Sequence, residues 1–336
     1  MAALNAPTRS FVQSTSFERT IGFLAACPFT LVYVLAPLYV LAALTLLLLF
    51  PLNPRTWLLL APLIVSLALP PWVAVQLSPY IMGNWASRQI PKYFAYEEYH
   101  EATDQELQAA HAEGKRFLLV AHPHGVFSFC GVCGFIASMC ASDGIGASLP
   151  IEVPTAAASV ICFFPFLKDV LGVFGVIDAS GSVLNRRLSR NRGSVVLYVG
   201  GIAELFASSP AREAVYLKKR KGFIKLALRT GADVLPVYFF GNTTVLSVLT
   251  AGPLAMLSRN IGVSVTLFWG RFFLPVPKPV KLVYARGRPL GLPHIEKPTD
   301  ADVDEWHAKY CAAVKELFDA YKGKNPDYAQ KELEIM

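Results

Sequence analysis

Charged side chains are nearly absent from one long stretch of this sequence. Between Thr20 and Ser87 the only Lys, Arg, Asp or Glu is Arg55, although such residues make up 16% of the 336-residue chain. Downstream of residue 88 about a fifth of the residues are charged, close to the roughly one quarter typical of soluble domains. This pattern excludes a disordered, collagen-like or coiled-coil chain. It predicts a membrane-embedded segment followed by a globular domain.

Cysteine is also scarce, with six residues in the whole chain, which argues against a disulfide scaffold. Cys130 and Cys133 have the spacing of a metal-ligand pair, but no second cysteine pair or nearby histidine pair completes a zinc site. We therefore expect reduced cysteines that act as small core residues, and we predict no metal site.

Several catalytic motifs are missing as well. The sequence has no phosphate-binding loop, no dinucleotide fingerprint and no Gly-x-Ser-x-Gly nucleophile elbow. Nucleotide hydrolysis, hydride transfer and serine-hydrolase chemistry therefore have no support. The net charge of +7 favours an anionic membrane surface as a partner. Nucleic acid is disfavoured, because no stretch interleaves basic residues with aromatic ones.

Two apolar runs, Leu31–Phe50 and Trp57–Val75, each approach the length of about 20 residues that a helix needs to cross a bilayer. A short turn with two prolines joins them, and the second run is interrupted by Pro70 and Pro71. We predict a membrane hairpin within residues 20–88, which either spans the bilayer or enters and returns.

The charges around the hairpin predict its orientation. Arg9 and Arg19 precede it, Arg88 and Lys92 follow it, and only Arg55 lies at the turn. By the positive-inside rule both ends of the hairpin should be cytoplasmic. A cleavable signal peptide is a poorer interpretation, because the apolar run exceeds the usual length of about 7–15 residues.

Alternating strand-like and helix-like segments predict an α/β fold for the rest of the chain. The expected strands are Arg116–Ala121, Ser194–Val199, Val234–Phe240 and Lys281–Arg286. The expected helices are Gln105–Glu113, Phe135–Ser142, Ser182–Arg190, Phe223–Thr230 and a long final helix after Thr299, with a core stripe of Val303, Trp306, Tyr310, Val314, Leu317 and Tyr321. We divide the chain into a polar N-terminal segment (1–19), the hairpin (20–88), an α/β domain (89–323) and a polar tail (324–336).

The His122-Pro123-His124-Gly125 turn follows the first expected strand directly. Residues just past the carboxyl end of a strand face the crevice where α/β proteins bind ligands. An imidazole with a pKa of about 6.5 is a suitable general base at neutral pH. We predict a catalytic turn, the alternative being two loop histidines with structural hydrogen bonds.

A second motif, Val199–Glu204, follows the second expected strand. Gly200 and Gly201 would let the backbone approach a substrate, and their N–H groups could serve a developing oxyanion. Glu204 could hold a histidine in one tautomer, the alternative being a solvated carboxylate that opens a helix.

A basic run, Lys218–Lys221, precedes Gly222 at the start of an expected helix. Because helix N-termini attract anions, Arg220, Lys221 and Gly222 are candidate ligands of a phosphate-bearing molecule. The alternative is a solvated or membrane-facing charged surface.

In their order and spacing these segments resemble the type-2 diacylglycerol acyltransferase family. The resemblance includes His122–Gly125, Val199–Glu204 and a highly specific block from Arg220 to Gly241. It also includes Pro277–Val280 and Gly287–Leu290.

Three positions depart from the family pattern. Ala95 stands where the family usually has Pro after Tyr-Phe, and Asn242 stands where it has Glu after Phe-Gly. Gly181 follows Ser180 where the family has Arg. These departures bear on the acceptor more than on the type of reaction.

The resemblance implies a glycerolipid-acyltransferase-like mixed sheet flanked by helices, behind an N-terminal membrane hairpin. It implies an enzyme of the endoplasmic reticulum membrane that moves a fatty acyl group from acyl-CoA to diacylglycerol, forming triacylglycerol. His124 would accept the proton of the acceptor hydroxyl, and His122 would orient His124 or assist the leaving thiolate. Glu204 would hold an imidazole tautomer, and Arg220 and Lys221 would meet the phosphates of coenzyme A.

Acyl-CoA is a substrate in this scheme, and no cofactor, metal or covalent intermediate is required. The expected partners are acyl-CoA, a glyceride acceptor and membrane lipid, and a homo-oligomer is left open. Lipid droplets are a second expected location. Monoacylglycerol, a long-chain alcohol or a lysophospholipid are alternative acceptors. A lipid-droplet coat or tether is the non-enzymatic alternative.

Overall fold

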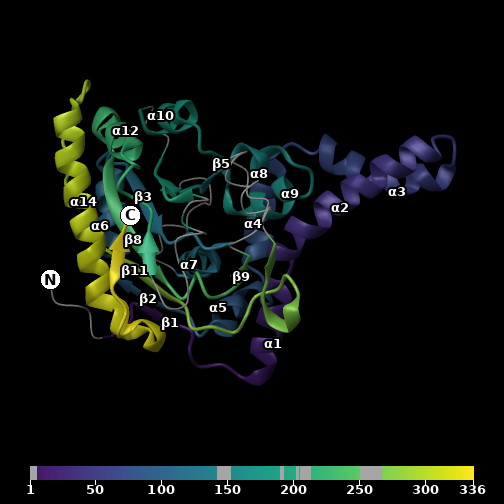
Figure 1. The fold of residues 1–336 in the computed structure, drawn as a ribbon, viewed down its shortest axis with the longest axis horizontal. Coiled ribbons are helices and arrows are strands. Elements are labelled where there is room, and N and C mark those ends of the chain that lie inside the picture. Colours follow the sequence, from purple (N-terminus) through teal and green to yellow (C-terminus); the bar gives the residue numbers. More distant parts are fainter. Residues whose placement is uncertain (1–5, 142–152, 190–192, 202–203, 205–212, 250–266) are drawn as a thin grey trace.

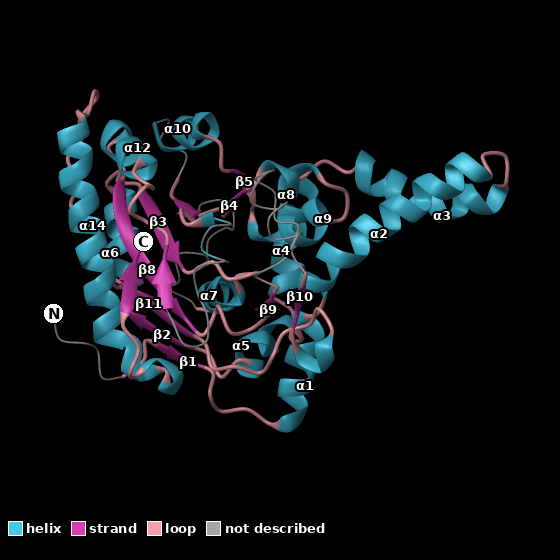
Figure 2. Cartoon of the chain, viewed as in Figure 1, coloured by secondary structure: helices cyan, strands magenta, loops and turns pink. Residues whose placement is uncertain are grey.

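In the computed structural model the described residues are 6–141, 153–189, 193–201, 204, 213–249 and 267–336. A six-stranded mixed sheet with the order β1-β2-β11-β8-β3-β6 forms the centre of the fold. Its strands are β1 Arg9–Ser10, β2 Glu97–His100, β11 Val283–Arg286, β8 Asp233–Phe240, β3 Phe117–His122 and β6 Val195–Leu197. The expected mixed α/β sheet flanked by helices is therefore confirmed (Figure 2).

The register of the central strands decides which segments lie together at one edge of the sheet. β3 pairs in parallel with both β8 and β6, whereas β8 pairs antiparallel with β11. His122 is paired with Tyr238 at the end of β3, and Leu118 is paired with Val195 of β6. Because these three strands are parallel, the segments that follow β3, β6 and β8 emerge at the same edge.

Alternating side chains of the sheet pack into two separate cores. Leu119 of β3 belongs to the core that contains α7 (Phe129–Cys140) and the N-terminal helices. Leu118 belongs to the other core, with α12 (Gly222–Thr230) and α14 (Asp300–Tyr321). This period of two is what a strand covered on both faces requires.

Local signals explain where the helices begin and end. Thr299 and Asp302 form a capping box at the start of α14, and Gly231, with φ +70°, ends α12. The predicted helices after 299 and over 223–230 are confirmed, and α7 starts six residues before its predicted start. Ser142 and Arg190, the predicted ends of two helices, lie outside the described residues.

The remaining elements are shorter or peripheral. The other helices are α1 Ser16–Ala26, α2 Pro28–Leu49, α3 Pro54–Ala68, α4 Trp72–Met82, η1 Ser87–Gln89, α5 Ile90–Tyr93, α6 Asp104–Ala112, α8 Ser159–Phe163, α9 Leu167–Leu171, η2 Gly172–Phe174, α10 Gly181–Ser189, η3 Arg271–Phe273, η4 Lys322–Lys324 and η5 Pro326–Tyr328. In the described part of the chain, three small sheets pair β4 Ala156–Ala157 with β5 Ile177–Asp178, β7 Glu213–Val215 with β12 Leu333–Ile335, and β9 Ser247–Val248 with β10 Phe268–Trp269.

The apolar N-terminal helices extend away from the sheet (Figure 1). Residues 16–49 form one helical stretch that is long and apolar enough to cross a membrane, by length and composition. α3 and α4 pass the same test only together, and they meet at an angle of 101°. At this bend Lys168 Nζ of α9 donates to the carbonyl oxygen of Leu69 at 2.7 Å, and Asp169 accepts a hydrogen bond from Ser66. The bend is therefore held by the globular part of the chain.

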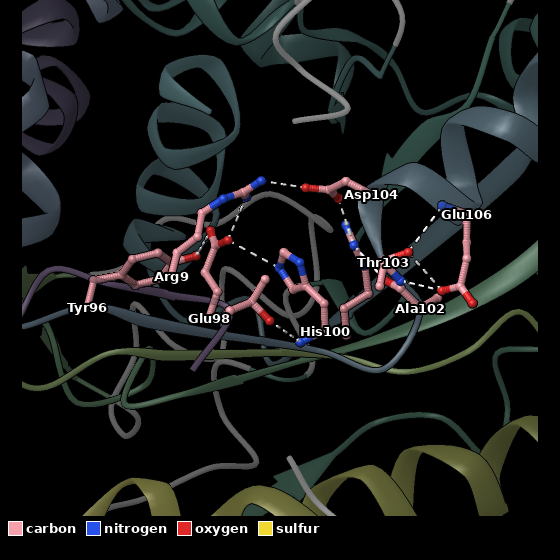
Figure 3. A network of polar contacts seen from close by, with 10 residues as sticks. Arg9, Tyr96, Glu98, His100, Ala102, Thr103, Asp104 and Glu106 are labelled. Carbon is pink, nitrogen blue, oxygen red and sulfur yellow. Dashed lines mark hydrogen bonds and ion pairs between the residues drawn. The ribbon is translucent and has the colours of Figure 1, made fainter. Parts of the chain in front are cut away.

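A buried polar network fixes the N-terminal segment to the sheet edge (Figure 3). Arg9 of β1 pairs with Glu98 at 2.8 Å and with Asp104, and Arg286 of β11 pairs with Asp104 at 2.7 Å. His100 Nε2 lies 3.1 Å from a Glu98 carboxylate oxygen. Charges this deeply buried are found where they are paired, as they are here.

The polar N-terminal segment and the polar tail each contribute a strand to a sheet. β1, within residues 1–19, pairs antiparallel with β2, and β12, within residues 324–336, pairs in parallel with β7. Tyr328 and Leu333 of the latter segment are buried. The boundaries of the four divisions stay a prediction, but these ends pack against the α/β domain.

Candidate active site

The histidine turn begins with the last residue of β3, His122, whose side chain is fully buried. Its Nδ1 lies 2.9 Å from Glu204 Oε1, and its Nε2 lies 3.1 Å from the Tyr310 hydroxyl of α14. A carboxylate can only accept, so Nδ1 donates to Glu204, and the Tyr310 hydroxyl also lies 3.3 Å from the Val120 carbonyl oxygen, to which it can donate. Both nitrogens of this imidazole are therefore engaged within the protein.

His124 is placed differently, with a half-buried ring. Its Nδ1 donates to the Gly125 carbonyl oxygen at 2.7 Å, which leaves the lone pair on Nε2. Within the described part of the chain Nε2 has no hydrogen-bond partner. Burial of the ring lowers the pKa of His124, against smaller opposing effects of the Gly125 carbonyl and the Glu204 carboxylate. Burial therefore favours the neutral form of the ring, in which Nε2 can accept a proton.

Glu204 connects the two histidines, because its other oxygen, Oε2, accepts from the His124 backbone N–H at 3.1 Å. A Cβ at Gly200 would lie 2.2 Å from the Glu204 carboxylate, so glycine leaves the space in which this side chain reaches His122. Gly201 has φ +56°, a conformation that favours glycine. The two glycines thus serve the placement of Glu204.

Asn242, just past the end of β8, holds the turn from the opposite side. Its Nδ2 donates to the carbonyl oxygens of Pro123 at 3.1 Å and His124 at 2.6 Å. Its Oδ1 accepts from the backbone N–H of Cys130 at the start of α7, at 3.1 Å. The side chain is buried, so one amide fixes both the histidine turn and the helix that follows it.

Tyr198, just past β6, lines the open side of the turn. Its ring meets the His124 ring edge-on, with centroids 4.6 Å apart, and its hydroxyl donates to Ser128 Oγ at 2.9 Å. In the sequence Asn242 stands out only as a departure from the family pattern, and nothing there points to Tyr198 or to the contact that Tyr310 makes with His122. The positions of Tyr198 and Asn242 just past strands were a usable signal for both.

The basic run lies at the same edge of the sheet as the histidine turn. Phe223, the second residue of α12, packs against Tyr310 with ring centroids 4.9 Å apart, and Tyr310 contacts His122. Lys221 Nζ pairs with exposed Asp304 at 2.6 Å, and the Arg220 guanidinium lies 5.5 Å from the Tyr216 ring centroid.

Space remains open where α12 begins. A Cβ added at Gly222 would meet no atom within 4 Å, so close packing does not account for this glycine.

Comparisons with known proteins identify the family. The diacylglycerol acyltransferase family model matches residues 49–336. The chain belongs to this family. It is 34% identical to diacylglycerol O-acyltransferase 2 of Dictyostelium discoideum over 66% of this chain and 70% of that protein. It is also 34% identical to human acyl-CoA wax alcohol acyltransferase 1 over 61% of this chain and 66% of that protein.

Among solved structures, the chain is similar to the 1-acyl-sn-glycerophosphate acyltransferase PlsC of Thermotoga maritima. The TM-score is 0.41 at 11% identity, over 89% of this chain and 96% of that one.

In this member of the diacylglycerol acyltransferase family, the predicted catalytic residues His122, His124 and Glu204 lie together. Glu204 accepts from the imidazole of His122 and from the backbone N–H of His124, whereas the Gly125 carbonyl oxygen accepts from the imidazole of His124. The catalytic roles of these residues, and the binding roles of the glycines and the basic run, stay predictions.

Proposed function

We propose that this chain is a membrane-bound enzyme that transfers a fatty acyl group from acyl-CoA to diacylglycerol, with His124 as general base. Membership of the diacylglycerol acyltransferase family supports the reaction. The observation that carries the assignment of the base is the Nε2 lone pair of His124, which has no hydrogen-bond partner among the described residues, whereas the Nδ1 and Nε2 atoms of His122 contact Glu204 and Tyr310.

In the proposed reaction the acceptor hydroxyl oxygen attacks the thioester carbonyl carbon while its proton moves to His124 Nε2. The tetrahedral intermediate carries an oxyanion, for which the N–H groups near Gly200 and Gly201 are candidate donors. Collapse breaks the carbon–sulfur bond, and the proton on His124 passes to the leaving thiolate of coenzyme A. His122 and Glu204 position His124, because Glu204 binds the side chain of one histidine and the backbone of the other.

The start of α12 is the proposed site of the donor's phosphates. Arg220 and Lys221 supply cations next to a helix N-terminus, which attracts anions. Lys221 is exposed, and its partner Asp304 is exposed as well, so a phosphate can replace this carboxylate at little cost.

The proposed membrane anchor is the hairpin within residues 20–88, which includes α2, α3 and α4, and the proposed locations are the endoplasmic reticulum membrane and lipid droplets. Residues 16–49 are long and apolar enough to span a bilayer. Attachment to a leaflet brings the site to the layer in which water-insoluble acceptors diffuse. A water-poor site would also protect the acyl donor from hydrolysis.

A long-chain alcohol is a second candidate acceptor. The chain is as similar to the human acyl-CoA wax alcohol acyltransferase 1, at 34% identity, as it is to the Dictyostelium protein. The product would then be a wax ester, formed by the same proton transfers.

The test is expression of the full chain in cells that lack triacylglycerol synthesis, followed by analysis of the lipids that appear. We expect triacylglycerol to form, and we expect membranes with His124→Ala, at equal protein level, to lose about 10²–10⁴-fold in rate. Wax esters without triacylglycerol would select the second acceptor. Normal triacylglycerol formation by the His124→Ala membranes would refute the proposed base.

A further inference from the structure

The loop Arg271–Leu274 exposes more apolar surface than its position in the globular part of the chain explains. Phe272, Phe273 and Leu274 are 66%, 88% and 54% exposed. Both phenylalanines have φ +58°, in the left-handed region that residues with a bulky side chain rarely adopt. We name Arg271–Leu274 the phenylalanine loop.

Backbone contacts hold the phenylalanine loop in this conformation. The N–H of Gly270 donates to the Leu274 carbonyl oxygen at 2.7 Å, and the N–H of Arg271 donates to that of Val276 at 3.0 Å. A Cβ at Gly270 would lie 1.9 Å from the Val276 carbonyl oxygen, so only glycine permits this closure. Strained backbone that presents exposed rings is typical of a functional segment.

The phenylalanine loop lies against the base of the apolar helices. The Arg271 guanidinium is 5.2 Å from the Phe23 ring centroid of α1 and 4.6 Å from that of Phe272. α1 continues into α2, and Figure 1 shows the loop beside α1 where α2 departs from the domain. Two more aromatic residues with exposed rings are Phe17 of α1 and Trp85, whose ring centroids lie 6.1 Å from each other.

We infer that the phenylalanine loop is a second membrane contact, which inserts Phe272, Phe273 and Leu274 into the interfacial region of a phospholipid leaflet. This inference rests on the membrane anchor proposed above. Aromatic rings with a neighbouring arginine match the chemistry of that region, where rings sit at headgroup level and a guanidinium reaches the lipid phosphates. Continuity with the membrane helices favours this occupant over a protein partner.

The contact has a consequence for the active site. β9, which pairs with β10 just before the phenylalanine loop, begins five residues after Asn242. Lys278 Nζ also donates to Ser247 Oγ of β9 at 2.7 Å. A loop fixed in the leaflet therefore fixes the distance of the histidine turn from the acceptor's layer.

The direct test uses the full chain in phosphatidylcholine vesicles that contain a phosphatidylcholine with a diazirine on its acyl chain. After irradiation, mass spectrometry maps the lipid adducts. We expect adducts on Phe272–Leu274 and on exposed α2 residues such as Leu38, and few on the exposed face of α14 around Lys309. Adducts on α2 without adducts on the loop would overturn the inference and leave the anchor intact. Adducts on neither α2 nor the loop would overturn both the loop contact and the hairpin anchor. Adducts on the loop alone would support the loop contact and contradict the hairpin anchor.

A double variant, Phe272→Asn with Phe273→Asn, separates membrane contact from internal packing. Asn tolerates the left-handed conformation better than Phe, so the melting temperature in detergent should stay the same or rise. Adducts on Leu274 should fall several-fold, while those on α2 should not change. A clear fall in melting temperature would show that the rings stabilise the protein itself and would overturn the inference.

Discussion

At the scale of residues, the two histidines of the turn differ in what surrounds their nitrogens. His122 is enclosed between Glu204 and Tyr310, so a substrate proton could reach its Nε2 only if Tyr310 moved. The Nδ1 proton of His124 points to the Gly125 carbonyl oxygen, and its Nε2 takes no part in this hydrogen bond. This difference is the reason why we propose a positioning role for His122 and the role of general base for His124.

The lowered pKa of His124 predicts a pH dependence. A general base acts in its deprotonated form, and burial places this pKa below the ordinary value of 6.5. Acyl transfer should therefore be constant around neutral pH and should fall as the pH drops through the lowered pKa, by about tenfold per pH unit. The measurement is kcat/KM for acyl-CoA in membranes across this range. A rate that still rises above neutral pH would assign the base to another group.

Asn242→Asp tests whether the amide holds the turn. A carboxylate has no N–H for the carbonyls of Pro123 and His124, and it is repelled by both, so we expect a loss of about 1–3 kcal/mol of stability and most of the activity. Asn185→Asp is the matched control, because Asn185 is only partly buried and its Oδ1 accepts from Arg229 at 2.9 Å, a bond that a carboxylate can keep. The measurements are melting temperature and acyl transfer, and equal results for the two variants would contradict the role of Asn242.

At the scale of elements, the ion pairs of Arg9 hold the short strand β1 in place more firmly than the pairing of its two residues with β2 does. Arg9 lies between the buried carboxylates Glu98 and Asp104. Removing one partner of such a buried group leaves charges without compensation.

Arg9→Met should therefore lower the free energy of unfolding by about 3–5 kcal/mol. The control is Arg288→Met, because Arg288 pairs with Glu106 at 3.7 Å with both side chains half exposed, and such pairs contribute about 0–1 kcal/mol. Thermal unfolding of the purified variants measures the difference. Two equal melting temperatures would mean that β1 contributes nothing to the domain.

The strands of the central sheet show which elements a sequence pattern predicts and which it misses. β3 and β8 are runs of Leu, Val and Phe, and they were predicted within a residue at each end. β2 was missed because Glu-Glu-Tyr-His has the composition of a loop. Glu98 of this strand is buried against Arg9, which lies 89 residues earlier in the chain, and the neighbouring Asp104 pairs with Arg286, which lies 182 residues later.

The site was predictable to a similar extent. Its motifs follow strands, so a parallel sheet places them at one edge. Which histidine Glu204 contacts depends on the register of β3 against β6, and that is a property of three-dimensional packing. Tyr310 belongs to a helical stripe that was interpreted as core. The stripe is core, yet the hydroxyl at its centre reaches His122.

At the scale of the whole molecule, the chain leaves the domain to form the apolar helices and returns to it on the same face. β1 precedes them in the chain and β2 follows them, and the two strands are paired. Lys92, after the hairpin, also pairs with Glu18, before it, at 2.5 Å. The chain must therefore leave and re-enter the domain on one side of any membrane that the helices enter, and the 101° bend between α3 and α4 is compatible with such a return.

This geometry predicts, without counting charges, that both ends of the chain lie on one side of the membrane, and the charges around the hairpin predict that this side is the cytoplasm. In sealed microsomes, epitope tags at the two ends of the chain should both be accessible to protease from the cytoplasmic side. β12 pairs with β7 inside the same globular part, so the C-terminal tag should share the side of the N-terminal one. Solubilising the vesicles with detergent is the control for protected tags. Protection of one tag alone would require β1 and β2 to lie on opposite sides of the membrane. That arrangement is incompatible with the pairing of Arg9 with Glu98, and it would overturn the hairpin as well.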